Sequence, residues 1–132
     1  MINYSTKPST AFISGHIMVE NGEFALHYAA RILKAYSLGH HFVIGDADGI
    51  DLLAQKLLLV LGATSDRVTI YHMFTKPRFN VGFNTSGGYK NNEERDAAMT
   101  KNSNYDIAWV RPGKEKSGTA RNLARRKEFG ER

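Results

Sequence analysis

The order of apolar and polar residues along the chain predicts a regular succession of strands and helices. Short runs of mostly apolar or β-branched residues predict strands at Thr10–Ile13, Phe42–Ile44, Arg67–Met73 and Tyr105–Val110. Longer stretches, the first two with apolar residues spaced three and four apart, predict helices over residues 22–37, 49–61, 92–102 and 117–129. Gly39 and Gly62 stand where the first two helices are expected to end.

Strands that alternate with helices predict a mostly parallel sheet, because parallel neighbours need crossover connections. The expected fold class is therefore α/β, a three-layer Rossmann-like domain with at least four strands and helices on both faces of the sheet. At 132 residues the chain is expected to form one domain, residues 1–132.

No period holds over residues 74–91, which contain Pro77 and several glycines and asparagines. This pattern predicts a long irregular loop. Long loops inside compact domains commonly act as lids over a site, so we expect this one to close over a ligand through Arg78 or Tyr89.

Three polar turns follow predicted strands, at the edge where open α/β sheets bind their ligands. They are Ser14-Gly15-His16, Gly45-Asp46-Ala47-Asp48-Gly49-Ile50-Asp51 and Ser117-Gly118-Thr119. Glycine lets the backbone approach a phosphate closely, and a helix start presents unpaired N–H groups. The three turns together predict one ligand site better than any single turn does.

The turn from Gly45 to Asp51 matches neither the dinucleotide-binding pattern nor the Walker pattern, and its spacing fails the calcium-loop pattern. Its carboxylates repel phosphate oxygens unless they face ribose hydroxyls or a bound cation. The alternative is structural: Asp46 or Asp48 caps the following helix and Asp51 favours its dipole. Capping alone does not require the two flanking glycines.

The turn at Ser117 has the same two interpretations, since a hydroxyl there either caps the last helix or contacts a phosphate. Arg121 and Arg125 follow four residues apart on one face, where an anion would relieve their repulsion. His16 is a candidate for ligand or acid/base work, with a plain hydrogen-bonding role as the alternative. The remaining histidines lack metal-ligand spacing, and we predict neither a metal nor a cofactor.

The formal net charge of +5 lies entirely in the C-terminal part of the chain. Residues 111–132 hold eight basic and three acidic side chains, while residues 1–110 are neutral. Such a segment suits a phosphate ligand, a nucleic acid or an acidic partner, or it is a solvated helix face. The absence of cysteine, of a leader pattern at Met1–Pro8 and of long apolar runs predicts a cytoplasmic protein without membrane contact.

With these residues in view, the chain resembles the SLOG superfamily, a Rossmann-like group that includes the DprA/Smf proteins and the LOG phosphoribohydrolases. It is most similar to the small single-domain YspA-like members. The resemblance rests on Ile13 to His16, on Gly45 to Asp51, and on Arg95 to Met99 continuing through Asp106-Ile107-Ala108 to Ser117-Gly118-Thr119. It implies a nucleotide or nucleotide-derived ligand above the strand ends, with Gly15, Gly45, Gly49, Gly118 and Thr119 around its phosphate and sugar.

LOG enzymes cleave the N-glycosidic bond of cytokinin nucleotides and carry a Gly-Gly-x-Gly-Thr-x-x-Glu motif. Gly118 and Thr119 match its Gly-Thr, but Asn122 stands where the glutamate belongs. Arg95 matches an arginine of the family, and Asp96 replaces the neighbouring lysine. An amide cannot serve as a carboxylate base, so the LOG mechanism is not expected.

If hydrolysis occurs, Asp46, Asp48 or Asp96 has to supply the carboxylate. The leading hypothesis is nevertheless a binding module, a sensor or a sequestering protein for a nucleoside phosphate or ADP-ribose-like ligand. An N-glycosidic hydrolase or transferase comes second. Single-stranded DNA binding through the basic C-terminus comes third, because the aromatic residues lie mostly at core spacing. A homodimer or larger homo-oligomer is expected.

Overall fold

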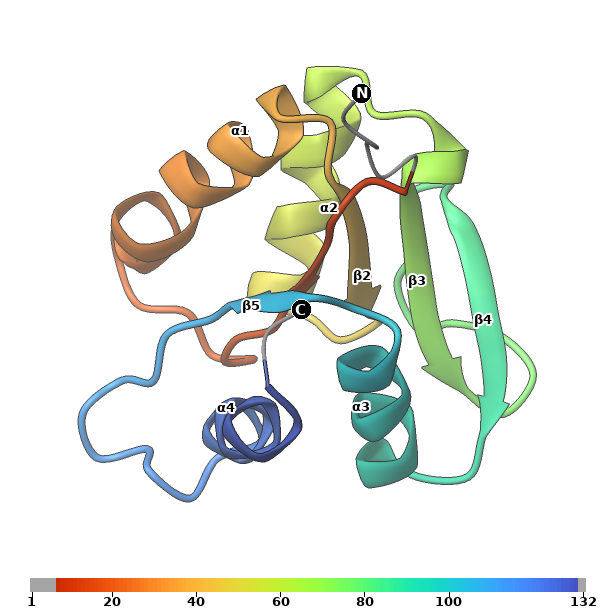
Figure 1. Cartoon of the computed structure of the whole chain (residues 1–132). Coiled ribbons are helices and arrows are strands. Elements are labelled where there is room, and N and C mark those ends of the chain that lie inside the picture. Colours follow the sequence, from red (N-terminus) through yellow and green to blue (C-terminus); the bar gives the residue numbers. More distant parts are fainter. Residues whose placement is uncertain (1–6, 131–132) are drawn as a thin grey trace, which may run out of the picture.

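The computed structural model describes residues 7–130, which form a three-layer α/β domain (Figure 1). The strands are β1 (Thr10–Ile13), β2 (His41–Gly45), β3 (Val68–Met73), β4 (Asn84–Tyr89) and β5 (Tyr105–Ile107). The helices are η1 (Ala25–Ala29), α1 (Ala30–Ser37), α2 (Ile50–Leu61), η2 (Ser65–Arg67), α3 (Asn92–Lys101) and α4 (Gly118–Phe129). Residues 1–6 and 131–132, which the leader and domain predictions include, lie outside this range.

All strands of the sheet are parallel, in the order β4-β3-β2-β1-β5. The chain builds outward from β1 to β4 and then returns through α3 to place β5 on the other side of β1. The order therefore reverses between β1 and β5. Ligands of open α/β sheets bind beyond the carboxyl ends of the strands at such a switch point.

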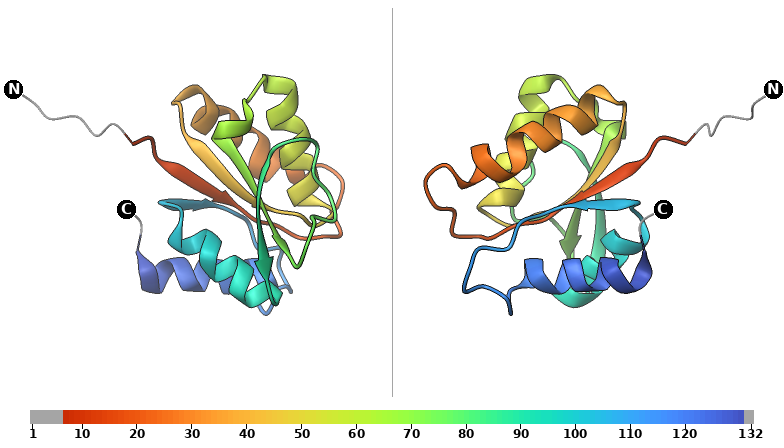
Figure 2. Two further views of the ribbon diagram at one scale, coloured as in Figure 1. Left: turned by 90° about the vertical axis from the view of Figure 1, so that its right-hand side faces the viewer. Right: turned by 60° about the vertical axis from the view of Figure 1, so that its left-hand side comes forward.

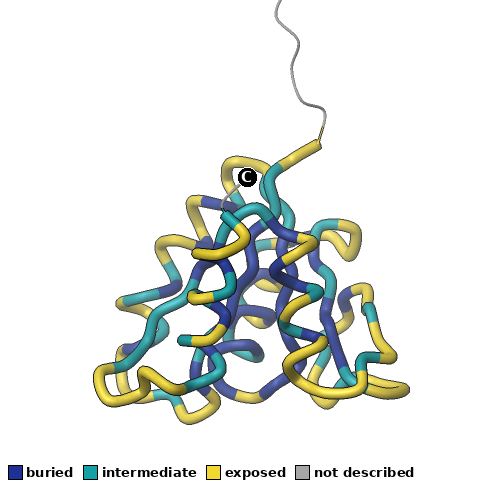
Figure 3. The backbone as a smooth tube through the Cα atoms, turned by 60° about the horizontal axis from the view of Figure 1, so that its bottom comes forward, coloured by how far each residue is buried: buried dark blue, intermediate teal, exposed yellow. Residues whose placement is uncertain are grey.

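The sheet is covered on both faces, with η1, α1 and α2 on one and α3 and α4 on the other (Figure 2). Alternate residues of β1 serve the two layers, since Ala11 and Ile13 pack on the α1 and α2 side while Phe12 joins Val43 and Met99 on the α3 side. Strands β1, β2, β3 and β5 are mostly buried at the centre of the molecule, while much of the surrounding chain is exposed (Figure 3). The predicted fold class is confirmed.

The prediction of an irregular loop from residue 74 to residue 91 is wrong over residues 84–89, which form the edge strand β4. This strand, with the sequence NTSGGY, shows no apolar alternation because it is mostly exposed on both faces. A shorter segment, residues 74–83, crosses from β3 to β4 in place of a helix. It packs beside α2, where Gln55 Nε2 donates to the Phe79 carbonyl and Gln55 Oε1 accepts from the Val81 N–H.

Other predicted boundaries hold within a few residues. The predicted strand at 105–110 ends at Ile107, after which the chain leaves the sheet toward α4. Within residues 7–130, no helix combines the length and the apolar character needed to cross a lipid bilayer.

Candidate ligand cavity at the carboxyl edge

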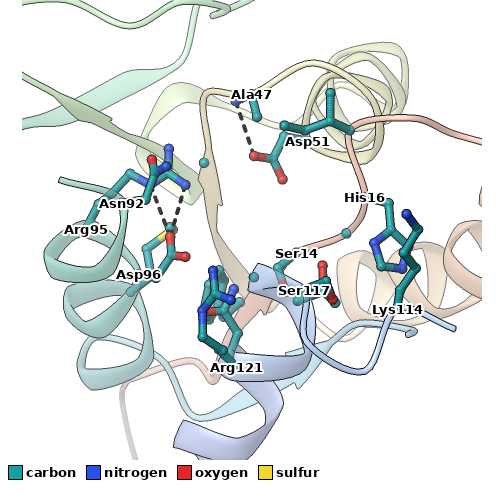
Figure 4. A pocket seen from close by; sticks show the side chains of 18 of the residues that line it. Ser14, His16, Ala47, Asp51, Asn92, Arg95, Asp96, Lys114, Ser117 and Arg121 are labelled. Carbon is teal, nitrogen blue, oxygen red and sulfur yellow. Dashed lines mark hydrogen bonds and ion pairs between the residues drawn. The ribbon is translucent and has the colours of Figure 1, made fainter. Parts of the chain in front are cut away.

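A cavity of about 410 Å³ lies at the carboxyl ends of β1, β2 and β5, between α3 and the start of α4 (Figure 4). Its wall consists of Phe12, Ser14, Gly15, His16, Ile17, Met18, Gly45, Ala47, Asp51, Arg78, Asn92, Arg95, Asp96, Met99, Arg111, Lys114, Ser117, Gly118, Thr119, Arg121 and Asn122. All three polar turns that the sequence singles out contribute to this wall. Its volume is within the range of small-molecule sites.

Most residues predicted to bind a ligand lie on this wall. They are Ser14, Gly15, His16, Gly45, Ala47, Asp51, Arg95, Ser117, Gly118, Thr119 and Asn122. Asp46, Asp48 and Gly49 are not on it. Of the three carboxylates predicted as catalytic candidates, only Asp96 lines the cavity.

Tyr28, in the π-helical turn η1, fixes the β1 and β5 loops relative to each other. Its buried hydroxyl donates to the Ser14 carbonyl at 2.8 Å and accepts from the Trp109 N–H at 3.0 Å. Burial raises the pKa of Tyr28 to about 12, so the hydroxyl keeps its proton and both hydrogen bonds at neutral pH. These two hydrogen bonds therefore hold together the two loops that form one side of the cavity.

Asp46 is held by two arginines behind the cavity wall. Its carboxylate accepts from Arg78 (Nη2 at 2.9 Å and the backbone N–H at 2.8 Å) and from Arg95 Nη1 at 2.8 Å. Burial pushes its pKa upward, but the hydrogen bonds and charge of Arg78, together with the charge of Arg95, hold the pKa of Asp46 below its usual value. A carboxylate engaged in this way is a structural anchor and not an available base.

Gly49 and the exposed Asp48, which belong to the same turn as Asp46, also have structural explanations. Gly49 has a φ of 75°, and a Cβ there would lie 2.2 Å from the Ile17 carbonyl oxygen. Its backbone passes directly beneath the β1 loop, where the Ile50 N–H donates to the His16 carbonyl. Asp48 is exposed, and its Oδ1 accepts from the Gly49 N–H.

Asp51 is the buried carboxyl group of the wall. It is 6% exposed, and its Oδ2 accepts from the Ala47 N–H at 3.2 Å (Figure 4). Burial, only partly opposed by the charge of Arg95, raises the pKa of Asp51 to about 7. Gly45 makes room for this carboxyl group, because a Cβ at Gly45 would lie 2.6 Å from Asp51 Oδ2.

Asp96 lies across the cavity on α3. Its Oδ1 accepts from both Nε and Nη2 of Arg95, at 3.1 and 3.0 Å (Figure 4). Burial raises the pKa of Asp96 despite the Arg95 charge and a hydrogen bond from Asn122. The Asn122 Oδ1 accepts from Arg125 Nη1 at 2.8 Å, which turns the amide N–H₂ toward Asp96.

The start of α4 forms the cationic end of the cavity. Ser117 caps the helix by accepting from the Ala120 N–H, as the structural interpretation of this turn predicts. A Cβ at Gly118 would meet only Arg121 Nη2, at 3.7 Å, so packing does not require glycine there. Lys114 and Arg121 flank this helix start, where the backbone N–H groups and the helix dipole favour an anion.

His16 is neutral at pH 7. Burial, followed by the charge of Arg111, lowers its pKa, and its Nε2 is 3.0 Å from the Arg111 N–H. Because Nε2 accepts this hydrogen bond, the ring proton is on Nδ1. On the same loop, the Ser14 hydroxyl has no hydrogen-bond partner among residues 7–130.

Sequence reasoning missed several wall residues. Ile17 and Met18 lie at the cavity mouth with their side chains largely exposed. Arg111 is held by Glu23 and the Met18 carbonyl, and joins the two loops beside the cavity. The excess of basic residues over 111–132 was the available signal for Arg111 and Lys114, and Arg121 was already singled out together with Arg125.

The two residues predicted to form a lid have different positions. Arg78 is on the wall but is bound to Asp46. Tyr89 belongs to β4, away from the wall, and stacks on Tyr71 with ring centroids 5.8 Å apart. Tyr89 is therefore part of the sheet edge in this structure.

In the described part of the chain, no three histidine, aspartate or glutamate side chains gather in a way that would hold a metal ion. Comparisons of the chain with family models, with curated proteins and with solved structures give no match.

Proposed function

We propose that the cavity binds a nucleotide or nucleotide-derived ligand and that the protein acts as a sensor or sequestering module for it. The observation that carries the proposal is the meeting of the β1, β2 and β5 loops around one cavity of about 410 Å³ at the switch point of the sheet. The resemblance to the SLOG superfamily points the same way.

The distribution of charge along the wall supports a ligand with one anionic end. Arg78 and Arg95 are engaged by aspartates and Arg111 by Glu23. Lys114 and Arg121 form no ion pair within residues 7–130 and lie beside the start of α4, where Arg121 Nη1 donates to the Lys116 carbonyl and Gly118 leaves the backbone accessible. A phosphate fits this end by charge and by hydrogen bonding.

The rest of the wall suits the uncharged, polar part of a nucleotide. It includes Asp51, Asp96 and Asn122, together with Phe12 and Met99. Carboxyl and amide groups bind sugar hydroxyls and base edges, and the apolar side chains cover the faces of a ring.

Isothermal titration calorimetry with nucleoside monophosphates and ADP-ribose tests the proposal. Removing Lys114 and Arg121 together (K114A/R121A) is expected to weaken binding at least tenfold, because each charge-assisted hydrogen bond is worth about 1.5–3 kcal/mol. Lys56 and Lys127 are exposed and lie off the wall, so K56A/K127A is a control with the same loss of charge. No binding of any of these compounds to the wild-type protein would contradict the proposal.

N-glycosidic hydrolysis is the second candidate, favoured by the two wall carboxyl groups whose pKa values are raised, Asp51 and Asp96. In this reaction a water adds to the anomeric carbon, the carbon–nitrogen bond breaks and the base leaves with a proton. Asp96 replaces Asp46 and Asp48 as the carboxylate in this scheme, because those two lie off the wall.

Incubation with purine and pyrimidine nucleoside monophosphates and with NAD, followed by detection of released base, tests hydrolysis. Activity that persists in D96N would remove Asp96 from the scheme. If no base is released while tight binding is retained, hydrolysis is excluded and binding remains as the proposed function.

The α4 contacts favour a small ligand over single-stranded DNA. Arg126 is buried and donates to Asp106 and to Ser103, and Arg125 is bound to Asn122. These arginines therefore support the fold and the wall, which leaves fewer cations for a nucleic-acid backbone.

Self-association is proposed through the outer surface of α2. Leu59 and Val60 are exposed there, with the exposed Lys56 on the same helix. Light scattering of the wild-type protein and of a V60E variant, which places a charge on this surface, tests it.

A further inference from the structure

Asp51 is a buried carboxyl group without a cation of its own. The two guanidinium groups nearest to it form ion pairs with other carboxylates. Arg95 pairs with Asp46 and with Asp96, and Arg78 pairs with Asp46. Among residues 7–130, its oxygens accept one hydrogen bond, from the Ala47 N–H, and form no ion pair. A carboxylate buried without a counter-ion is costly, so this environment favours the protonated acid.

Asp51 reaches the cavity wall because residue 45 is glycine. A Cβ at Gly45 would lie 2.6 Å from Asp51 Oδ2, so the carboxyl group occupies the space that a side chain at residue 45 would need, and Gly45, Asp51 and Arg95 all line the cavity. The φ of Gly45 is not in the left-handed region, so backbone conformation does not require glycine there. A ligand atom that enters the cavity at this point of the wall lies within reach of the acid.

We propose that the wall at Asp51 is a subsite for a ligand carbonyl oxygen, which accepts a hydrogen bond from the acid group of Asp51 and lies beside Arg95. The inference rests on the proposed nucleotide site and assigns its base end to these residues. A carboxylate at residue 51 would repel a carbonyl oxygen and the anionic ligand as a whole. Binding therefore weakens as Asp51 loses its proton.

The charged and titratable groups that act on Asp51 come from every element around it. They are Arg95 and Asp96 on α3, Asp46 on the β2–α2 turn, Arg78 on the 74–83 crossover and Tyr28 on η1. Asp46 raises the pKa of Arg78, which keeps its charge in the neutral range, and Tyr28 stays neutral with its pKa at about 12. Asp46 ionises well below neutrality, but burial raises the pKa of Asp96 as well as that of Asp51, so the D51N variant is needed to assign a pH dependence to Asp51.

The first arm of the test needs no ligand. Carbon-13 NMR of aspartate carboxyl groups, with the Asp51 signal identified by its loss in D51N, is expected to give a midpoint near pH 7, because burial raises the pKa of Asp51 to about 7. A midpoint below pH 5 would overturn the proposal whatever the protein binds.

The second arm measures affinity from pH 6 to pH 8 with cyclic GMP and cyclic UMP, whose bases carry carbonyl groups. Both carry only phosphodiester-type groups, which keep a constant charge over this range, unlike a phosphate monoester. Wild-type affinity is expected to fall about tenfold from pH 6 to pH 8, following the protonated fraction of Asp51.

Matched variants separate the subsite from general effects. D51N keeps a donor that does not titrate, so its affinity is expected to match wild type at pH 6 and to stay flat to pH 8. D51A lacks the donor, and in G45A the added Cβ displaces the Asp51 carboxyl group, so both are expected to bind weakly at pH 6. Asp48 is exposed and off the wall, so D48N is expected to keep the wild-type pH profile.

The outcomes distinguish this inference from the proposed function. If a probe binds the wild-type protein tightly but without pH dependence, the subsite is overturned and nucleotide binding stands. The same holds if the D51N and D51A variants bind the probe equally weakly. If neither probe nor any nucleoside monophosphate binds, the proposed function fails and the subsite fails with it, even where NMR finds the proton on Asp51. Melting curves of each variant at pH 6 check that it is folded.

Discussion

The β2–α2 turn and the β5–α4 turn carry the same sequence signal, glycine among polar residues at the start of a helix, but the structure uses them differently. In the β2–α2 turn, Gly49 passes beneath another backbone segment and Asp46 is bound by two arginines. In the β5–α4 turn, the space beside Gly118 is open, and a methyl group added there would have an atom of Arg121 as its nearest neighbour.

The difference shows that a glycine next to a helix start has two separate causes. One is the close approach of the protein to itself, and the other is access for something outside the chain. The β2–α2 turn is mainly of the first kind, with Gly45, Ala47 and Asp51 as its contribution to the cavity. In the β5–α4 turn the glycine has no packing reason, which is what the proposed approach of a phosphate requires.

The largest effect that separates the two turns is expected from Gly49→Ala. The new Cβ would lie 2.2 Å from the Ile17 carbonyl oxygen, at a φ of 75° that alanine adopts only with strain. We expect a loss of about 4 kcal/mol in the free energy of unfolding, from left-handed strain and overpacking together. Urea denaturation measures it. A loss below about 1 kcal/mol would mean that the β1 loop moves away easily and that the turn is not packed as described.

A smaller loss is expected from Asp46→Asn. The amide cannot hold the charges of Arg78 and Arg95, which Asp46 contacts at 2.9 and 2.8 Å. Breaking a buried ion pair on one side costs about 3 kcal/mol. Because the pKa of Asp46 is lowered in the folded state, its contribution is present near neutral pH and is lost as the pH falls below about 4. Wild-type and variant stabilities should therefore converge in acid, and a constant difference down to pH 3 would contradict the role of its charge.

The sequence predicts the layers of this fold better than it predicts its site. Apolar or β-branched runs mark every strand except β4, whose exposed, glycine-containing sequence carries no apolar pattern, and helical spacing marks the helices predicted over residues 22–37 and 49–61. Turns at strand ends identify the cavity because parallel topology brings those ends together. The sequence does not show which turn residues face inward, since the pairing of Asp46 with Arg78 and Arg95 joins residues 32 and 49 positions apart.

An effect of opposite sign is expected from Asp51→Asn. The folded-state pKa of Asp51 is raised to about 7, so folding favours its neutral form and wild-type stability falls as the pH rises from about 4 to 7. The variant lacks this penalty. It is expected to be more stable than wild type at pH 8, by on the order of 2 kcal/mol, and nearly equal to it at pH 4. Thermal melting at the two pH values measures the difference, and a variant less stable than wild type at pH 8 would argue that the carboxylate is stabilised in place.

The smallest effect on stability is expected from Gly118→Ala, the counterpart of Gly49→Ala in the β5–α4 turn. A methyl group there makes only an ordinary contact, 3.7 Å from Arg121 Nη2, and alanine favours the helix, so the change in unfolding free energy should stay within about 0.5 kcal/mol. The methyl group would instead occupy the space through which a phosphate oxygen approaches the N–H groups of α4. Affinity for a nucleoside monophosphate is therefore expected to fall about tenfold. If Gly118→Ala binds as wild type does, no phosphate approaches this helix start, and the two turns differ only in how tightly the protein packs around them.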